Sequence, residues 1–573
     1  MSSWFVHQAD EAAAQALTRE LRLSPLRARL MVARGLDTPE AARAFLDPSP
    51  DHLHDPFLFD EMREAVRLVR ETIAARGRIL VHGDYDADGI CGTALLAEGL
   101  RRIGADVHYF VPDRVRDGYG IASRVIERSL EVGIGLLITV DCGSSDDEIV
   151  RRLAAAGVPV IITDHHEIGG RIPEASAVLN PKLPGERYPF KELCGTGVAL
   201  KLMQALQRAI GVDIGLSALL DLAAVGTLGD YVGLAGENRT IVALGMRRLA
   251  QWERPGFEAL RRECGLAPRG VSAKQVCFNI VPRLNSPGRI GSAREVVEML
   301  LTADEIEAAE IAARIEEMNR QRRAHDSQVT EEASYLADIV LRRGDPSALV
   351  FSSSSWHEGV VGIGAARLAE NYDLPAVLIA VRDGLGKGSA RSAGRLNIRD
   401  ALERCSRYLV AYGGHREAGG FTIAEEHIPE FIRAFNQIAG ESPAGDGGPV
   451  SHWADAEIRL QDCELDLVSF IEKLEPFGPG NHEPLFLLRG LRVGDQTKVV
   501  GKGHLRLTVE DPTGGWRDLI GFSLAKAWDP ADLSGAEVDV LAHLRRNAWQ
   551  GREEAQVQVT VIRPAGEQVP AQR

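Results

Sequence analysis

Three carboxylates and one imidazole fall within seven consecutive residues of this sequence, HGDYDAD at positions 82–88. Two more acidic segments follow, Asp141-Cys142-Gly143 and Asp164-His165-His166. Like charges at this density repel one another unless cations neutralise them. Carboxylate oxygens mixed with imidazole nitrogens suit Mn²⁺ or Mg²⁺, and a pair of such ions is typical of enzymes that act on phosphoesters. These residue types therefore predict a centre of divalent cations and phosphoester chemistry.

Each acidic segment also has a simpler explanation when it is taken alone. An Asp-rich turn is a good N-terminal cap, so residues 82–88 fit a solvated turn before the helix expected at Thr93–Ile103 equally well. Asp141 alone is a common turn or cap residue, and Asp230 alone indicates little. Only their joint position, at successive strand or loop ends, favours the metal centre over separate turns.

The elements that would position these residues alternate between strand and helix. Short apolar runs separated by helices of about ten residues are typical of βαβ units and a parallel sheet. Ligands of such sheets bind beyond the carboxyl ends of the strands, where all three acidic segments would lie. The expected strands are Arg78–His82, Val107–Val111, Leu136–Val140 and Val158–Thr163, and the expected helices are Met62–Ala75, Thr93–Ile103, Ser123–Val132 and Asp146–Ala155.

At 573 residues the chain is too long for a single core, and we expect an α/β multidomain protein. A second α/β unit would include strands near Ala348–Ser352 and Ala376–Ala380, and a period of two near the C-terminus predicts a small OB-like barrel. The predicted division is a helical lead-in at 1–60, a parallel-sheet domain at 61–302 with a loop at 226–230, a linking helix at 303–342, a smaller α/β domain at 343–440, a flexible linker at 441–450 and a barrel at 451–573.

Composition restricts the class of protein. Seven scattered cysteines without C-x-x-C pairs predict a reducing cytoplasm and no structural zinc. There is no apolar run of membrane length, and we expect no secretory signal. The formal net charge of −15 makes nucleic-acid binding less expected, because phosphates attract basic surfaces. It does not exclude such binding, since acids gathered around cations contribute to the total.

Four segments resemble, in chain order, the motifs of the DHH phosphoesterase superfamily: residues 82–89, Asp141-Cys142-Gly143, Asp164-His165-His166 and Gly226–Asp230. Gly413-Gly414-His415 resembles the signature of the associated DHHA1 domain. With the lead-in, the linking helix, residues 474–481 (LEPFGPGN) and the barrel, the chain resembles end to end the RecJ family of bacterial 5′→3′ exonucleases specific for single-stranded DNA.

The resemblance implies a role for each matching position. The metal ligands would be His82, Asp86, Asp88, Asp141, His165 and Asp230, with Asp141 shared between two Mn²⁺ or Mg²⁺ ions. Asp84, His166 and His415 would be catalytic, the two histidines facing the scissile phosphate. The 5′-phosphate and the DNA backbone would be bound by Arg114, Arg289, Ser389, Arg391, Gly413 and Gly414. For residues 389–391 a plain surface loop, and for 413–415 a plain tight turn, remain alternatives.

The expected activity is therefore release of 5′-mononucleotides from single-stranded DNA, in DNA repair and recombination, with two cations activating a shared water. The resemblance implies single-strand-binding protein and a RecQ-type helicase as partners, and we expect a monomer in the cytoplasm, at the nucleoid, without membrane association. Trp516, Phe522 and Trp549, among basic residues of the barrel, predict a stacking surface, although tryptophans in small barrels are often core residues.

Two other functions stay open. Relatives of the superfamily hydrolyse pyrophosphate, polyphosphate, oligoribonucleotides or cyclic dinucleotides, but a small substrate has no need of a stacking barrel. A non-catalytic DNA-binding relative is the second alternative. Such proteins lose metal-binding acids, and every expected acid is present here.

Overall fold

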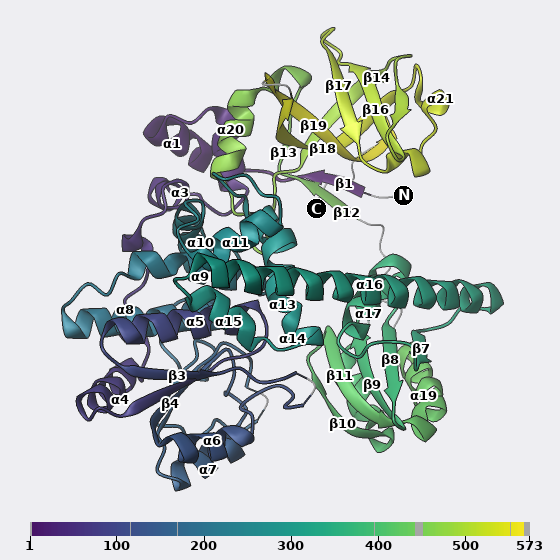
Figure 1. Ribbon diagram of the computed structural model, residues 1–573. Helices are drawn as coiled ribbons and strands as arrows, with labels where there is room; N and C mark the ends of the chain where they lie inside the picture. Colours follow the sequence, from purple (N-terminus) through teal and green to yellow (C-terminus); the bar gives the residue numbers. More distant parts are fainter. Residues whose placement is uncertain are drawn as a thin grey trace.

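The computed structural model describes residues 3–114, 116–168, 170–394, 396–441, 451–549 and 552–566. Two α/β domains lie side by side beneath one long helix, and a β-barrel lies on the other side of that helix (Figure 1). Most of the predicted linker, residues 442–450, falls outside the described residues. Among the described residues, none of the helices combines the length and the apolar character that a membrane crossing requires.

The first α/β domain is built on a parallel sheet of five strands, in the spatial order β3-β2-β4-β5-β6. After β2 the chain moves to β3 on one side and then to β4 on the other. The loops that follow β2 and β4 therefore diverge and open a crevice between them. The strands are β2 (Arg78–His82), β3 (Asp106–Phe110), β4 (Ile134–Val140), β5 (Val160–Thr163) and β6 (Ala177–Leu179).

Helices cover the sheet and extend the domain. All four residues of β5 are buried, as expected for a parallel strand with both faces covered. The helices are α4 (Met62–Ala74), α5 (Ala87–Arg102), α6 (Arg124–Val132), α7 (Asp147–Ala155), α8 (Gly195–Ile210), α9 (Leu216–Gly229), α10 (Gly236–Leu249), α11 (Pro255–Glu263), α12 (Ala273–Gln275), α13 (Val281–Asn285), α14 (Pro287–Ile290) and α15 (Arg294–Leu301).

Two local predictions in this domain were wrong. Helix α5 begins six residues before the expected Thr93, because the Asp86 carboxylate accepts hydrogen bonds from the amides of residues 88 and 89 and caps the helix. Residues 226–229, expected as a loop, are the last turn of α9. Gly226 lies where α9 crosses α8, and a Cβ there would lie 2.3 Å from Thr196 Oγ1. This glycine thus permits close helix packing rather than a turn.

Helix α16 (Glu305–Arg343) joins the two α/β domains. An ion pair of 2.6 Å between Arg283 and Glu316 holds it to the first domain, and one of 3.0 Å between Arg367 and Asp326 holds it to the second. The second domain has the strand order β10-β11-β9-β8-β7, in which only β7 and β8 run parallel. Its elements are β7 (Leu349–Ser353), α17 (Val361–Tyr372), β8 (Ala376–Arg382), β9 (Leu385–Arg391), α18 (Ile398–Arg404), β10 (Leu409–Gly414), β11 (Ala418–Ala424) and α19 (Ile428–Glu441).

The barrel is a seven-stranded sheet in the order β13-β14-β18-β19-β17-β16-β15. A further pairing of β14 with β16 folds the sheet back on itself, as expected for a small OB-type barrel. Its elements are β13 (Ala456–Glu457), α20 (Leu465–Lys473), β14 (Phe486–Val493), β15 (Lys498–Val500), β16 (His504–Glu510), β17 (Trp516–Gly521), α21 (Pro530–Leu533), β18 (Glu537–Trp549) and β19 (Arg552–Pro564).

The N-terminal lead-in packs against the barrel. It contains the expected helices, α1 (Glu11–Leu21), α2 (Pro25–Val32) and α3 (Pro39–Leu46), and also an unexpected strand, β1 (Ser3–Val6). β1 pairs in parallel with β12 (Ser451–Ala454), directly before the barrel. Leu17, Leu30 and Met31 belong to the same hydrophobic core as Phe486 of β14. Sequence position alone had not indicated this association.

Candidate active site

The acidic residues of the first domain meet in the crevice beyond β2, β4 and β5. Three groups of side chains each place one ligand atom per residue within 4.8 Å of the others: Asp84 with Asp86 and Asp141, Asp88 with His165 and Asp230, and Asp141 with His165 and His166. Asp141 and His165 each belong to two groups, so the groups are continuous. We call Asp84, Asp86, Asp88, Asp141, His165 and Asp230 together the metal centre.

The N-terminus of α8 orients Asp88. Its Oδ2 accepts a hydrogen bond of 2.6 Å from the Gly195 amide, and its Oδ1 accepts one of 2.9 Å from the Thr196 amide. A Cβ on Gly195 would lie 2.5 Å from the Cβ of Asp141, so a larger residue would displace that ligand. Sequence reasoning missed this support. A helix N-terminus near a carboxylate is its physical basis, and only the fold reveals it.

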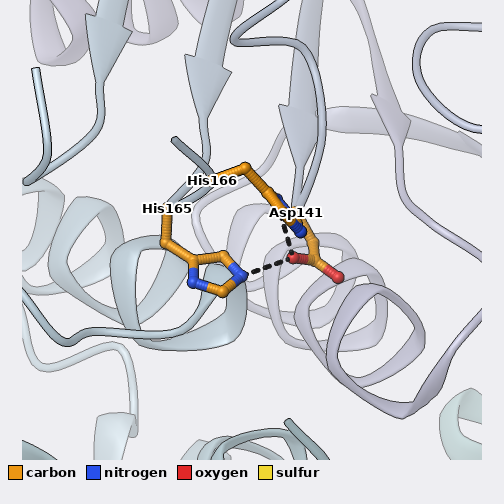
Figure 2. A group of neighbouring side chains, drawn as sticks. All are labelled: Asp141, His165 and His166. Atoms are coloured by element: carbon orange, nitrogen blue, oxygen red, sulfur yellow. Dashed lines mark hydrogen bonds and ion pairs between the residues drawn. The ribbon is translucent and has the colours of Figure 1, made fainter. Parts of the chain in front are cut away.

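Asp141 occupies the middle of the metal centre in an unusual backbone conformation. Its φ of 62° is left-handed, a conformation that costs energy for a residue other than glycine and persists only where the surrounding structure holds it. His165 Nε2 lies 3.0 Å from Asp141 Oδ1 and 3.4 Å from Asp230 Oδ2. Figure 2 shows the rings of His165 and His166 directed toward the same carboxylate. The backbone thus places Asp141 between neighbouring ligand groups.

The electrostatics of the centre call for cations. Burial, and next the charge of a neighbouring aspartate, raise the pKa of Asp84, Asp86, Asp141 and Asp230. Asp84 Oδ1, Asp230 Oδ2 and His165 Nδ1 are buried and have no hydrogen-bond partner among the described residues. Buried polar atoms normally have partners, and oxygen donors with an imidazole suit Mn²⁺ or Mg²⁺. The donor set therefore fits divalent cations.

The geometry does not bring His82 into any of the three groups of possible ligands, so its ligand role stays a prediction. Its Nε2 accepts a hydrogen bond of 3.1 Å from the Ala122 amide, and its Nδ1 lies 3.6 Å from Cys142 Sγ. Burial lowers the pKa of His82 to about 4. Within the described part of the chain His82 joins none of the three groups, whereas Asp84, expected to be catalytic, does. His82 ends β2 and packs into the fold, while the turn after it directs Asp84 toward Asp86 and Asp141.

His166 lies beside the metal centre. Its Nδ1 is 2.8 Å from Asp164 Oδ1 and 2.9 Å from the Tyr119 hydroxyl. Burial alone would lower the pKa of His166, but the hydrogen bond and the charge of Asp164 outweigh it and raise that pKa to about 9. With Asp164 as the partner of Nδ1, the other ring nitrogen of His166 is left to donate a hydrogen bond to an anion. Sequence reasoning missed Tyr119, whose only local signal is its position between two glycines.

A cavity of about 800 Å³ lies between the two α/β domains. Four of the predicted DNA-binding residues, Arg114, Arg289, Ser389 and Arg391, line it together with Tyr119. We call this cavity the strand-end pocket. Ser389 and Arg391 lie on β9 rather than on a surface loop, and Arg391 Nη1 donates a 2.9 Å hydrogen bond to Ser389 Oγ. Residues from both domains thus converge as the resemblance had implied.

The strand-end pocket is prepared for an anion. Burial, and next the charge of Arg114, lower the pKa of Arg289 to about 10 and also lower the pKa of Arg391. Among the described residues, none of the ion pairs joins these three arginines to a carboxylate. Clustered guanidinium groups without acidic partners match phosphate oxygens in charge and in the geometry of their donors.

The structure does not join the remaining predicted residues to the metal centre. Gly413 and Gly414 end β10, and His415 follows in the exposed turn before β11. His415 Nδ1 accepts a hydrogen bond of 3.3 Å from the Glu417 amide. In the described ranges, no hydrogen bond or ion pair links these three residues to the metal centre. Their roles therefore stay predictions.

On the barrel, Trp516 is 59% exposed and Phe522 is 52% exposed, so neither is a core residue. The side chain of Trp549 lies outside the described residues. Many of the predicted basic residues have acidic partners: Arg506 pairs with Asp518, Arg517 with Glu464, Arg545 with Glu483, and Arg546 with Glu472 and Glu553. These two aromatic side chains are thus available for stacking, but many of the basic residues of the barrel are already paired with acids.

Three parts of the chain match family models. Residues 78–227 match the N-terminal domain of the DHH family, residues 345–441 match the DHHA1 domain, and residues 454–560 match the RecJ OB domain.

Single relatives are similar to almost the whole chain. The chain is similar to the single-stranded-DNA-specific exonuclease RecJ of Bacillus subtilis, with 34% identity over 97% of this chain and 70% of the relative. The RecJ protein of Thermus thermophilus is 36% identical over 95% of this chain and 78% of the relative, and that of Escherichia coli is 32% identical over 95% and 96%.

Two solved structures are similar over almost the whole chain. The crystal structure of Thermus thermophilus RecJ with Mn²⁺ has a TM-score of 0.82 and 31% identity, and covers 98% of this chain and 79% of that one. The structure of the same protein with Mg²⁺ has a TM-score of 0.76 and 30% identity, over 98% and 78%. These similarities confirm the predicted fold class of parallel-sheet domain, DHHA1 domain and C-terminal barrel.

Proposed function

Because the chain belongs to the RecJ family of single-stranded-DNA-specific exonucleases, we propose that it releases 5′-mononucleotides from the 5′ end and holds two divalent cations. One observation carries the proposal most directly. Two groups of possible ligands adjoin at Asp141 and His165, and an arginine-lined pocket lies beside them.

The residues of the metal centre would hold the cations in two sets. Asp84, Asp86 and Asp141 form the first, and Asp88, His165 and Asp230 form the second, with Asp141 close to both. When bound, such cations lower the pKa of a coordinated water and neutralise charge on a phosphate in transfer.

The residues around the centre position the substrate. The ring of His166, held by Asp164, would donate a hydrogen bond to a non-bridging phosphate oxygen. Arg391 and Ser389 would bind the 5′-terminal phosphate, with Arg114 on the opposite wall and Arg289 toward the backbone. Selection of a phosphorylated end would give the enzyme its polarity.

The exposed Trp516 and Phe522 of the barrel favour a polymeric single strand, because stacking on aromatic rings binds bases without regard to sequence. A pyrophosphate or a cyclic dinucleotide would make no use of that surface. The proposal includes a role in DNA repair and recombination at the nucleoid in the cytoplasm, and single-strand-binding protein and a RecQ-type helicase as partners. The seven cysteines, all free, suit a reducing compartment.

A single-stranded oligonucleotide, labelled at either end and digested with Mn²⁺, tests the proposal. We expect the 5′ label to appear at once as a mononucleotide and the 3′ label to remain on a shortening strand. Arg391→Ala should slow strands with a 5′-phosphate more than strands with a 5′-hydroxyl. Arg382→Ala, at an exposed site on β8, is the matched control. Equal digestion from both ends would contradict the polarity.

A further inference from the structure

A buried arginine of the first α/β domain contacts both the lead-in and the barrel. Arg239, on α10, is 3% exposed. Its guanidinium donates hydrogen bonds to the carbonyl oxygens of Lys473 at 3.0 Å, Leu474 at 2.8 Å and Glu475 at 2.6 Å, at the end of α20. It also donates two, of 3.2 and 3.1 Å, to the carbonyl of Phe45 and lies 3.6 Å from the centre of that ring.

Backbone carbonyls at helix ends balance the positive charge of Arg239. Burial, and next the charge of Arg34, lower the pKa of Arg239 to about 10. In the described part of the chain, no carboxylate forms an ion pair with it. Its acceptors are instead backbone carbonyls at the C-terminal ends of α20 and α3, which carry partial negative charge. A planar guanidinium reaches all four oxygens at once, which the single ammonium of a lysine does not.

Nearby contacts strengthen the same junction. The Leu234 amide donates a 2.6 Å hydrogen bond to the Pro479 carbonyl, which connects the chain just before α10 to the loop after α20. Asn481 Nδ2 donates bonds of 2.8 and 2.7 Å to the carbonyls of Leu474 and Pro476 and so holds that loop closed. The junction therefore fixes the orientation of the barrel on the first domain.

We propose that Arg239 is a positioning residue for long single strands, which rests on the proposed function. It holds the stacking surface of the barrel at a constant place relative to the metal centre. A strand engaged on both then binds without the cost of ordering two mobile domains. A short strand that occupies only the cleft between the α/β domains gains nothing from this arrangement.

The test compares Arg239→Gln and Arg239→Lys with wild type on two 5′-phosphorylated substrates. One substrate has about four nucleotides and the other about 30, since one OB fold occupies roughly 4–16. For Arg239→Gln we expect KM on the long strand to rise at least about tenfold, because connected sites strengthen binding by about 10²–10⁴. We expect kcat, and all kinetics on the short strand, to be unchanged. For Arg239→Lys, KM on the long strand should lie between those of wild type and Arg239→Gln. Arg248→Gln, on the same helix and paired with Glu253 at the surface, is the matched control.

An unchanged KM on the long strand overturns the proposal. An equal loss of activity on both substrates also overturns it, because that result would indicate general damage to the first domain. Hydrogen exchange separates this proposal from the proposed function. In Arg239→Gln the Leu234 amide should exchange faster whether or not DNA is the substrate. Unchanged exchange there means that Arg239 does not hold the junction.

Discussion

Replacing Asp88 with asparagine removes one charge from the metal centre and keeps the shape of the side chain. The carboxylate is 1% exposed and accepts the amides of Gly195 and Thr196, one on each oxygen. An asparagine can accept only one of the two. The variant therefore loses a cation ligand and leaves one amide of α8 without its acceptor.

The structure sets the expected size of the effect without cations. A hydrogen bond to a charged acceptor contributes about 1.5–3 kcal/mol, and removing one of several buried like charges offsets part of that loss. We therefore expect the free energy of unfolding to fall by less than about 2 kcal/mol in the absence of cations.

The difference in stability between the variant and wild type should be larger when cations are present. At about 100 times Kd a ligand stabilises the folded state by about 2.7 kcal/mol, which for a domain of about 150–250 residues raises Tm by roughly 5–10 °C. We expect Asp88→Asn to show less than about half of that rise. Loss of about 4 kcal/mol of transition-state stabilisation would lower kcat/KM about 10³-fold.

Thermal unfolding in EDTA and in Mn²⁺, with single-turnover digestion of a labelled single strand, measures both quantities. Asp147→Asn serves as the control, because that carboxylate pairs with Arg151 on α7, outside the metal centre. A variant that keeps more than about a tenth of the wild-type kcat/KM, together with a wild-type Mn²⁺ shift, would refute the assignment of Asp88.

Four further substitutions test other parts of the site. Asp84→Asn should weaken Mn²⁺ binding at least about tenfold in calorimetry. His82→Gln should lower Tm and leave the affinity for Mn²⁺ nearly unchanged. Weaker Mn²⁺ binding in His82→Gln but not in Asp84→Asn would support His82 as the ligand. Gly226→Ala should force α8 and α9 apart and lower the free energy of unfolding by about 1–3 kcal/mol in denaturant titrations; an unchanged midpoint would show that the contact relaxes freely. Tyr119→Phe should lower kcat about 2–10-fold by removing the hydroxyl from His166, with Tm unchanged; a wild-type kcat would show that the hydroxyl is dispensable.

The local sequence pattern predicted most strands of the parallel sheet and the acids that follow them. The strand Arg78–His82 is found with the predicted bounds, and the acids that follow the strands meet because parallel strands share one carboxyl edge. Asp230 reaches the same crevice from the end of a helix rather than from a loop. Helix α9, which ends before Asp230, is apolar and buried on several sides. Its sequence therefore has no hydrophobic period that would distinguish it from a short strand followed by a turn.

Long-range packing accounts for the features of the site that the local sequence did not indicate. The motif suggested His82 as a ligand, but its ring is taken up by Ala122 and Cys142, from segments 40 and 60 residues away. The cluster of Arg114 with Arg391 required the resemblance, because neither residue has a local signal. The contacts of Arg239 had no sequence signal, since its partners are backbone carbonyls of any residue type.

The parallel pairing of β1 with β12 has a consequence for synthesis of the chain. Ser3 pairs with Ser451, which a ribosome adds 448 residues later. At about 5–20 residues per second the interval is roughly 20–90 s. Throughout it the first strand lacks its partner, and Trp4, fully buried in the finished protein, is without its cover. Both α/β domains can fold in that time, so the first strand made is among the last to dock. A chaperone that binds nascent apolar segments would find its target there, and slowed translation before residue 451 would prolong the exposure.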